Sequence, residues 1–112
     1  MVSIEYIRKG KAFCLTLSGH AGAAPKGMDL VCSAVSALVH TAAQCALDHY
    51  TDGELTEFPM VELKPGAAQV AAVAQPSYLE KVEQTFETVM TGCKLLQQQY
   101  PQFVTVKISN PQ

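Results

Sequence analysis

A histidine and a cysteine stand twelve residues apart in the first third of the chain, at His20 and Cys32. A thiol becomes a nucleophile when it loses its proton, and an imidazole within hydrogen-bonding distance can take that proton. The glycines between them, Gly22 and Gly27, would let the chain turn back and bring the two side chains together. The pair therefore predicts covalent chemistry at an acyl carbon, with Cys32 as nucleophile and His20 as base.

Cys32 is expected close to the beginning of a helix, because an apolar run from Leu30 to about Tyr50 follows a glycine-containing loop. If Asp29 is the N-cap residue, Cys32 is the third helical residue, where unpaired amides carry partial positive charge. That charge favours the thiolate, and the same amides could hold an oxyanion. Asp29 has a second interpretation, as the group that orients His20, and the N-cap interpretation is preferred because the position suits it.

Other polar residues near the pair have simpler interpretations. His40 lies about 12 Å along the helix from Cys32, too far for a hydrogen bond, and is expected to be satisfied within the helix. His49 is expected to interact with the helix C-terminal dipole when it is protonated. Ser36 is one turn from Cys32 and could line the same cleft or bond a carbonyl one turn back.

The remaining cysteines lie in apolar patterns and are interpreted as packing residues: Cys14, Cys45 and Cys93. They form no Cys-x-x-Cys pair with one another or with Cys32. This spacing argues against a zinc site, and no metal or cofactor is predicted.

The patterns around the pair predict a single α+β domain over residues 1–112, with two helices and a mixed or antiparallel sheet in the order β-β-α-β-β-α-β. Strands are expected at Val2–Lys9, Ala12–Ser18, 54–64 with an interruption near Pro59, Ala67–Ala74 and Phe103–Ile108, and a second helix is expected to open at Pro76 and stop at Pro101.

Composition limits the possible functions. Hydrophobic residues make up 48% of the 112 residues, which predicts a folded chain with a core of its own. The net charge of -2 argues against a protein that binds phosphate backbones, so no direct nucleic-acid partner is expected. Without a signal-peptide pattern or an uninterrupted apolar run of membrane length, we expect a cytoplasmic protein with free thiols and no membrane partner.

The stretch from residue 19 to residue 36 resembles the signature of the bacterial ribosomal-processing cysteine proteases, also described as the YsxB-like family. That signature is Gly-His-Ala, a short glycine-containing loop, and Asp-x-Val-Cys followed by two small residues and Val-Ser. Here it stands as Gly19-His20-Ala21 and Asp29-Leu30-Val31-Cys32-Ser33-Ala34-Val35-Ser36. The resemblance implies a homodimeric endopeptidase that uses no metal or cofactor and acts through a Cys-His dyad. It also implies the substrate, the short N-terminal extension of the twenty-seventh protein of the large ribosomal subunit, whose removal supports ribosome assembly.

Further residues of this stretch are expected to support the oxyanion or to bind substrate: Gly19, Gly22, Gly27, Asp29, Ser33 and Ser36. Two other classes of function remain open at this point. One is a thiol-dependent acyl transferase or thioesterase with the same dyad. The other is a non-enzymatic ribosome-associated module in which His20 and Cys32 are structural.

Overall fold

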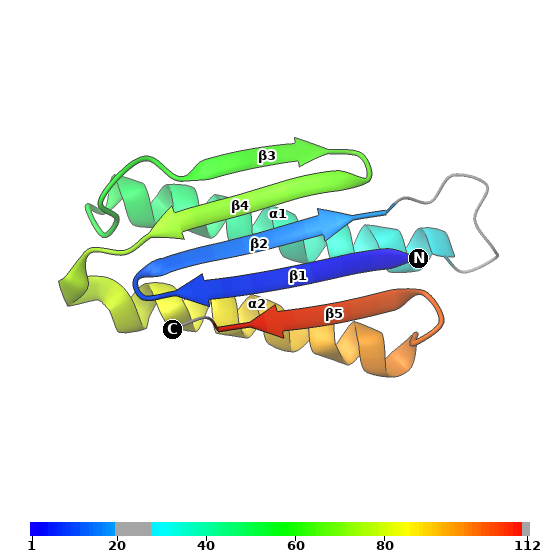
Figure 1. Ribbon diagram of the computed structural model, residues 1–112. Coiled ribbons are helices and arrows are strands. Elements are labelled where there is room, and N and C mark those ends of the chain that lie inside the picture. The colour runs from blue at the N-terminus through cyan, green and yellow to red at the C-terminus, as the bar shows by residue number, and fades with distance from the viewer. Residues whose placement is uncertain (20–27, 111–112) are drawn as a thin grey trace.

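A computed structural model describes residues 1–19 and 28–110 of the chain (Figure 1). The predicted order of strands and helices is confirmed, as is the α+β class. His20, Gly22 and Gly27 lie outside the described residues. The elements are β1 (Val2–Lys9), β2 (Ala12–Ser18), α1 (Met28–Thr51), β3 (Met60–Lys64), β4 (Ala67–Val73), a short 3-10 turn (Pro76–Tyr78), α2 (Leu79–Gln99) and β5 (Val104–Ser109).

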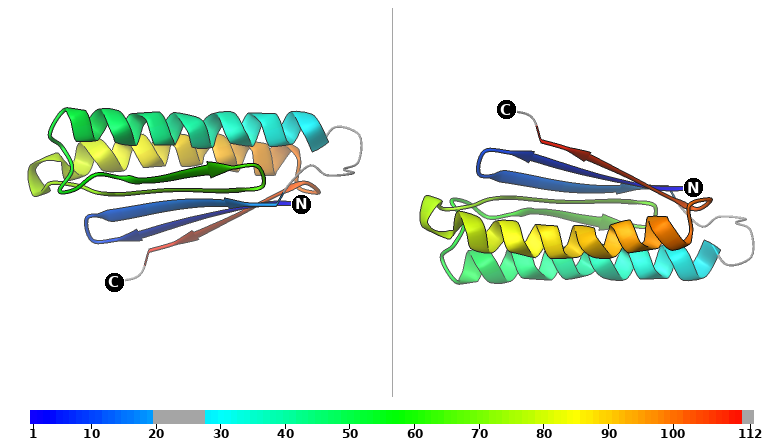
Figure 2. Two further views of the ribbon diagram at one scale, coloured as in Figure 1. Left: turned by 90° about the horizontal axis from the view of Figure 1, so that it is seen from above. Right: turned by 90° about the horizontal axis from the view of Figure 1, so that it is seen from below.

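The five strands form one mixed sheet in the order β3-β4-β2-β1-β5. The β1–β2 pair is antiparallel and is closed by a tight turn at Gly10, whose φ of 59° favours glycine. The β5 strand returns beside β1 in parallel after α2 has crossed the sheet, so that Val2 faces Val104. Both helices cover the same face of the sheet and leave the other face open (Figure 2).

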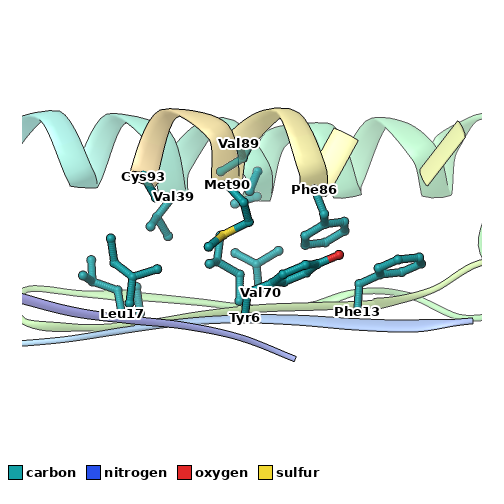
Figure 3. Close-up of a cluster of buried hydrophobic side chains, with 14 of the residues drawn as sticks. Tyr6, Phe13, Leu17, Val39, Val70, Phe86, Val89, Met90 and Cys93 are labelled. Atoms are coloured by element: carbon teal, nitrogen blue, oxygen red, sulfur yellow. The ribbon is translucent and has the colours of Figure 1, made fainter. Parts of the chain in front are cut away.

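The core lies between this helical layer and the sheet. Alternate residues of β1 and β2 point toward the helices, which follows from the period of two in a strand. In Figure 3 the rings of Tyr6 and Phe13 lie against Phe86 of α2, and the Phe13 and Phe86 centroids are 5.3 Å apart. Together with the buried Val39 and Met90, these side chains fix how α1 and α2 sit on the sheet.

The α1 helix is apolar because it packs on both the sheet and α2. Its segment Leu30–Thr51 is long and apolar enough to cross a membrane by length and composition, with a mean hydropathy of 1.6. In this fold, however, that segment supplies Val31, Val35 and Val39 to the core, where each is at most 1% exposed. About a third of the segment is buried, and these residues contribute to the core of a folded domain.

Three details differ from the expectations. The third strand covers only Met60–Lys64, because Pro59 lacks an N–H group for the ladder and the preceding segment keeps a single bridge, between Leu55 and Ala74. The second helix opens with a 3-10 turn at Pro76 before α2 begins. Cys93 is buried as predicted, whereas Cys14 and Cys45 are only half-buried and do not belong to the core.

Candidate active site

Cys32 lies one turn into α1, and this corrects the expected helix start. The helix begins at Met28, so Asp29 is its second residue and not its N-cap, and Cys32 is its fifth residue. At this depth the amide of Cys32 belongs to the regular hydrogen-bond ladder, so any oxyanion donor must come from the turn before it. Helical side chains lean toward the N-terminus, which directs Cys32 to the backbone amides of that first turn.

Gly19 sets the direction in which the chain leaves β2 toward His20. Its φ is 104°, a backbone conformation that residues with a side chain rarely adopt. A Cβ atom at this position would overlap the carbonyl oxygen of Met1. Its N–H donates to the carbonyl oxygen of Gly66 in the β3–β4 turn at 3.0 Å. The position of the residue before His20 is therefore fixed by two segments that are distant in the sequence.

Cys32 opens into a cavity of about 190 Å³ between the start of α1 and the sheet. Among the described residues that line this cavity, it is the only titratable side chain, and it is half-buried. Apolar residues make up most of the walls. The lining consists of Val2, Leu17, Gly19, Cys32, Val35, Ser36, Pro65 and Gly66.

Two of the predicted support residues, Ser33 and Ser36, lie on different faces of α1. Ser36 lines the cavity beside Cys32, and the described residues show no hydrogen bond from its hydroxyl to a carbonyl one turn back. Ser33 is exposed and does not line the cavity. His40 is confirmed as a helix histidine, since its Nδ1 lies 2.8 Å from the carbonyl oxygen of Ser36.

The structure adds a part of the cavity wall that the sequence interpretation did not include. Pro65 and Gly66 form the turn between β3 and β4, and this turn forms one side of the cavity that Cys32 lines. Leu17 at the end of β2 is a further wall residue. Nothing in the local pattern around these residues signals this role, because it depends on the place of the β3–β4 hairpin in the sheet.

His49, at the other end of α1, is not simply a dipole partner. It is 7% exposed, and its Nδ1 lies 2.7 Å from Oε1 of Glu54 while its Nε2 lies 2.8 Å from Oγ1 of Thr85. Lys81 donates to the other oxygen of Glu54 at 2.5 Å. The ion pair with Lys81, and then the bond with His49, hold the pKa of Glu54 below its ordinary value. Both ring nitrogens of His49 are therefore occupied within the protein.

A comparison with protein families places the chain in one of them. The family model described as cysteine protease Prp matches residues 1–105, which is nearly the whole chain. A comparison with curated proteins found no match.

Solved structures share the fold over nearly the same length. SMU.848 from Streptococcus mutans, known from a crystal structure, is 30% identical in sequence to this chain. The two structures match with a TM-score of 0.73 over 99% of this chain and 96% of that one. The essential ribosomal processing protease Prp from S. aureus in complex with a substrate peptide is 14% identical, with a TM-score of 0.71 over 96% and 99% of the two chains. The same S. aureus protease with a covalently linked product peptide is 17% identical, with a TM-score of 0.68 over 96% and 99%.

Proposed function

This chain belongs to the cysteine protease Prp family, and from that premise we propose that it removes the short N-terminal extension of the twenty-seventh protein of the large ribosomal subunit. Membership makes the chain a ribosomal-processing cysteine protease. The choice of substrate and the Cys32–His20 dyad belong to the proposal. One observation carries the proposal: Cys32 opens into a cavity at the start of α1 that has room for part of a peptide.

In the proposed mechanism, His20 takes the proton of the Cys32 thiol, and the sulfur attacks the carbonyl carbon of the scissile peptide bond. A C–S bond forms, the C–N bond breaks, and His20 gives the proton to the leaving amine. Water then attacks the thioester, breaks the C–S bond, releases the new carboxylate and returns the thiol. The amides of the first turn of α1 support the oxyanion in both steps, because their N–H groups are free of helix partners.

The mechanism is tested by incubating the protein with the extended ribosomal protein and weighing the products. We expect two fragments whose masses add up to the precursor plus one water. A Cys32→Ala variant is the control and should leave the precursor intact. Cleavage of small thioesters with no cleavage of the extended protein would favour acyl transfer instead.

We also propose that the protein is a homodimer. The open face of the sheet supports this, since a row of apolar side chains crosses four strands there at Ile7, Cys14, Ala71 and Met60. Phe58 beside this row is 64% exposed. Burial of such a row between two copies would remove apolar surface from water. Light scattering should give twice the monomer mass, and a Met60→Glu variant should give the monomer mass.

A cytoplasmic location in bacteria is part of the same proposal. All four cysteines are free thiols in the structure, and a reducing compartment keeps them so. Fractionation of bacterial cells with an antibody against the protein tests this location, and recovery with the membrane or the medium would contradict it.

A further inference from the structure

The cavity at Cys32 adjoins a second and larger cavity farther along α1. The second cavity has a volume of about 400 Å³, and the two cavities share Leu17, Ser36, Pro65 and Gly66 as lining residues. From α1 it is lined by Ser36 and His40, which are about 6 and 12 Å along the helix axis from Cys32. An extended peptide advances about 3.3 Å per residue. A peptide whose scissile bond is held at Cys32 therefore reaches the second cavity with a residue about two to four positions from that bond.

The floor of the second cavity is a row of side chains on three neighbouring strands. Ala68 of β4 is paired with Leu17 of β2 on one side and with Leu63 of β3 on the other. Paired residues carry their side chains on the same face of a sheet, and Leu17 lies on the buried face of β2. The row therefore points toward the face that the helices cover (Figure 2). Because the side chain of Ala68 ends at its β-carbon, a hollow remains above it between the two longer leucine side chains, and all three residues line the cavity.

The walls above Ala68 suit an apolar side chain. Val39 of α1 lines the cavity and is buried, whereas Leu63 is 38% exposed, so a side chain can enter from solvent beside it. Lys64 follows Leu63 in β3, and its side chain therefore points to the opposite face of the sheet. His40 is exposed, and no carboxylate is among the described residues that line the cavity. An apolar side chain would lose contact with water there without leaving a charge unpaired.

We infer that Ala68 sets the size of the substrate side chain that the second cavity accepts, and that this side chain is a large apolar one. This inference rests on the proposed function and names a residue that determines the specificity of the same site. The occupant belongs to the substrate because the second cavity is continuous with the cavity at Cys32. Ala68 acts by leaving space, so a larger residue at this position should fill the hollow and exclude the substrate side chain.

The first test measures kcat/KM for pairs of substrate peptides that carry leucine or alanine at one position, about two to four residues from the scissile bond on either side. With the wild-type protein we expect leucine to be preferred about tenfold or more at one of these positions. Ala68→Leu should abolish this preference at the same position by lowering kcat/KM for the leucine peptide. Ala67→Leu is the matched control and should keep the preference, because Ala67 is exposed on the opposite face of β4. If Ala68→Leu keeps the preference, or lowers kcat/KM equally for all peptides, the inference is overturned.

A second variant makes the test independent of whether Ala68→Leu folds, which thermal unfolding shows. Leu63→Ala removes one wall of the hollow, and the partial exposure of Leu63 keeps the cost in stability small. We expect kcat/KM to fall about fivefold for the leucine peptide and to stay unchanged for the alanine peptide, because only the leucine loses an apolar contact. An equal effect on both peptides would overturn the inference. If wild-type protein cleaves no peptide, the proposed function fails, whereas cleavage without a size preference at any position refutes only the role of Ala68.

Discussion

The two ends of α1 carry polar residues in opposite situations. At the N-terminal end, Cys32 is half-buried at the wall of a cavity, and in the described residues no salt bridge involves the residues that line it. At the C-terminal end, His49 is almost fully buried, and each ring nitrogen has a partner, Glu54 on one side and Thr85 on the other. The helix thus has one end that is left open and one that is closed.

This difference distinguishes Cys32, which is available for a reaction, from His49, which has a structural role. A histidine whose two nitrogens are both bonded inside the protein is held in place and cannot reach a thiol at the far end of the helix. Burial of the Glu54 carboxylate is balanced by Lys81 and His49, as a buried charge requires. A thiol beside an empty space has room for a reacting carbonyl.

The open end should lose all activity when its thiol is removed. We expect Cys32→Ala to lower the cleavage rate at least about 10⁴-fold, because the nucleophile is gone. Cys32→Ser should be nearly as inactive, since a hydroxyl is much harder to ionise than a thiol. Rates are measured by mass spectrometry of the products, and circular dichroism should show an unchanged fold. Cleavage by the alanine variant at the wild-type rate would refute the mechanism.

The two histidines should respond differently to the same change. His20→Ala should lower the rate by about 10²- to 10⁴-fold with little change in Tm, because a general base is lost. His49→Ala should lower Tm by about 5 °C or more, because Glu54 and Thr85 lose a buried partner, and should keep most of the activity at low temperature. An inactive His49→Ala variant with a normal Tm would show that the base has been assigned to the wrong histidine.

Gly19 should be sensitive to substitution, because its backbone conformation and its close neighbour both require glycine. Gly19→Ala meets the carbonyl oxygen of Met1 and forces a positive φ, so we expect a loss of about 2 kcal/mol in the free energy of unfolding and reduced cleavage. Gly53→Ala is the matched control, because its φ is also positive but its Cβ would meet no atom within 4 Å. Thermal unfolding and cleavage rates are compared for both variants. Equal activity in the two would show that Gly19 does not position the site.

Glu54, at the C-terminal end of α1, should make the thermal stability of the protein depend on pH. The pKa of Glu54 is lowered in the folded protein, so its stabilising contribution is present above its ordinary value of 4.5 and is lost as pH falls through the folded value. We expect Tm to fall on acidification below about pH 4.5, and Glu54→Gln to have a lower Tm at pH 7 and a flatter acid response. Glu62→Gln is the control, because the Glu62–Lys64 pair is exposed and worth little. The same acid response in wild type and Glu54→Gln would rule out this origin.

The strands and helices and their order can be predicted from the sequence alone. The alternation of Phe13, Leu15 and Leu17 specifies a strand with one buried face, and the apolar run after Leu30 specifies a helix, of which about a third is buried. These patterns reflect the repeat of a strand, two residues, and of a helix, about 3.6 residues, which involve only residues close together in the sequence. A single sequence is therefore enough to predict them. The spacing of His20 and Cys32 likewise predicts the chemistry, although His20 lies outside the described residues.

The surroundings of the Cys32 thiol, and the burial of His49 between two partners, depend on how the strands and helices pack together. The Pro65–Gly66 turn faces Cys32 because β4 pairs with β2, and that pairing also brings Gly66 to Gly19. His49 meets Thr85 across 36 residues because α1 and α2 pack side by side. Such contacts depend on the order of strands in the sheet and on the packing of the helices against it. Local periodicity carries no information about either.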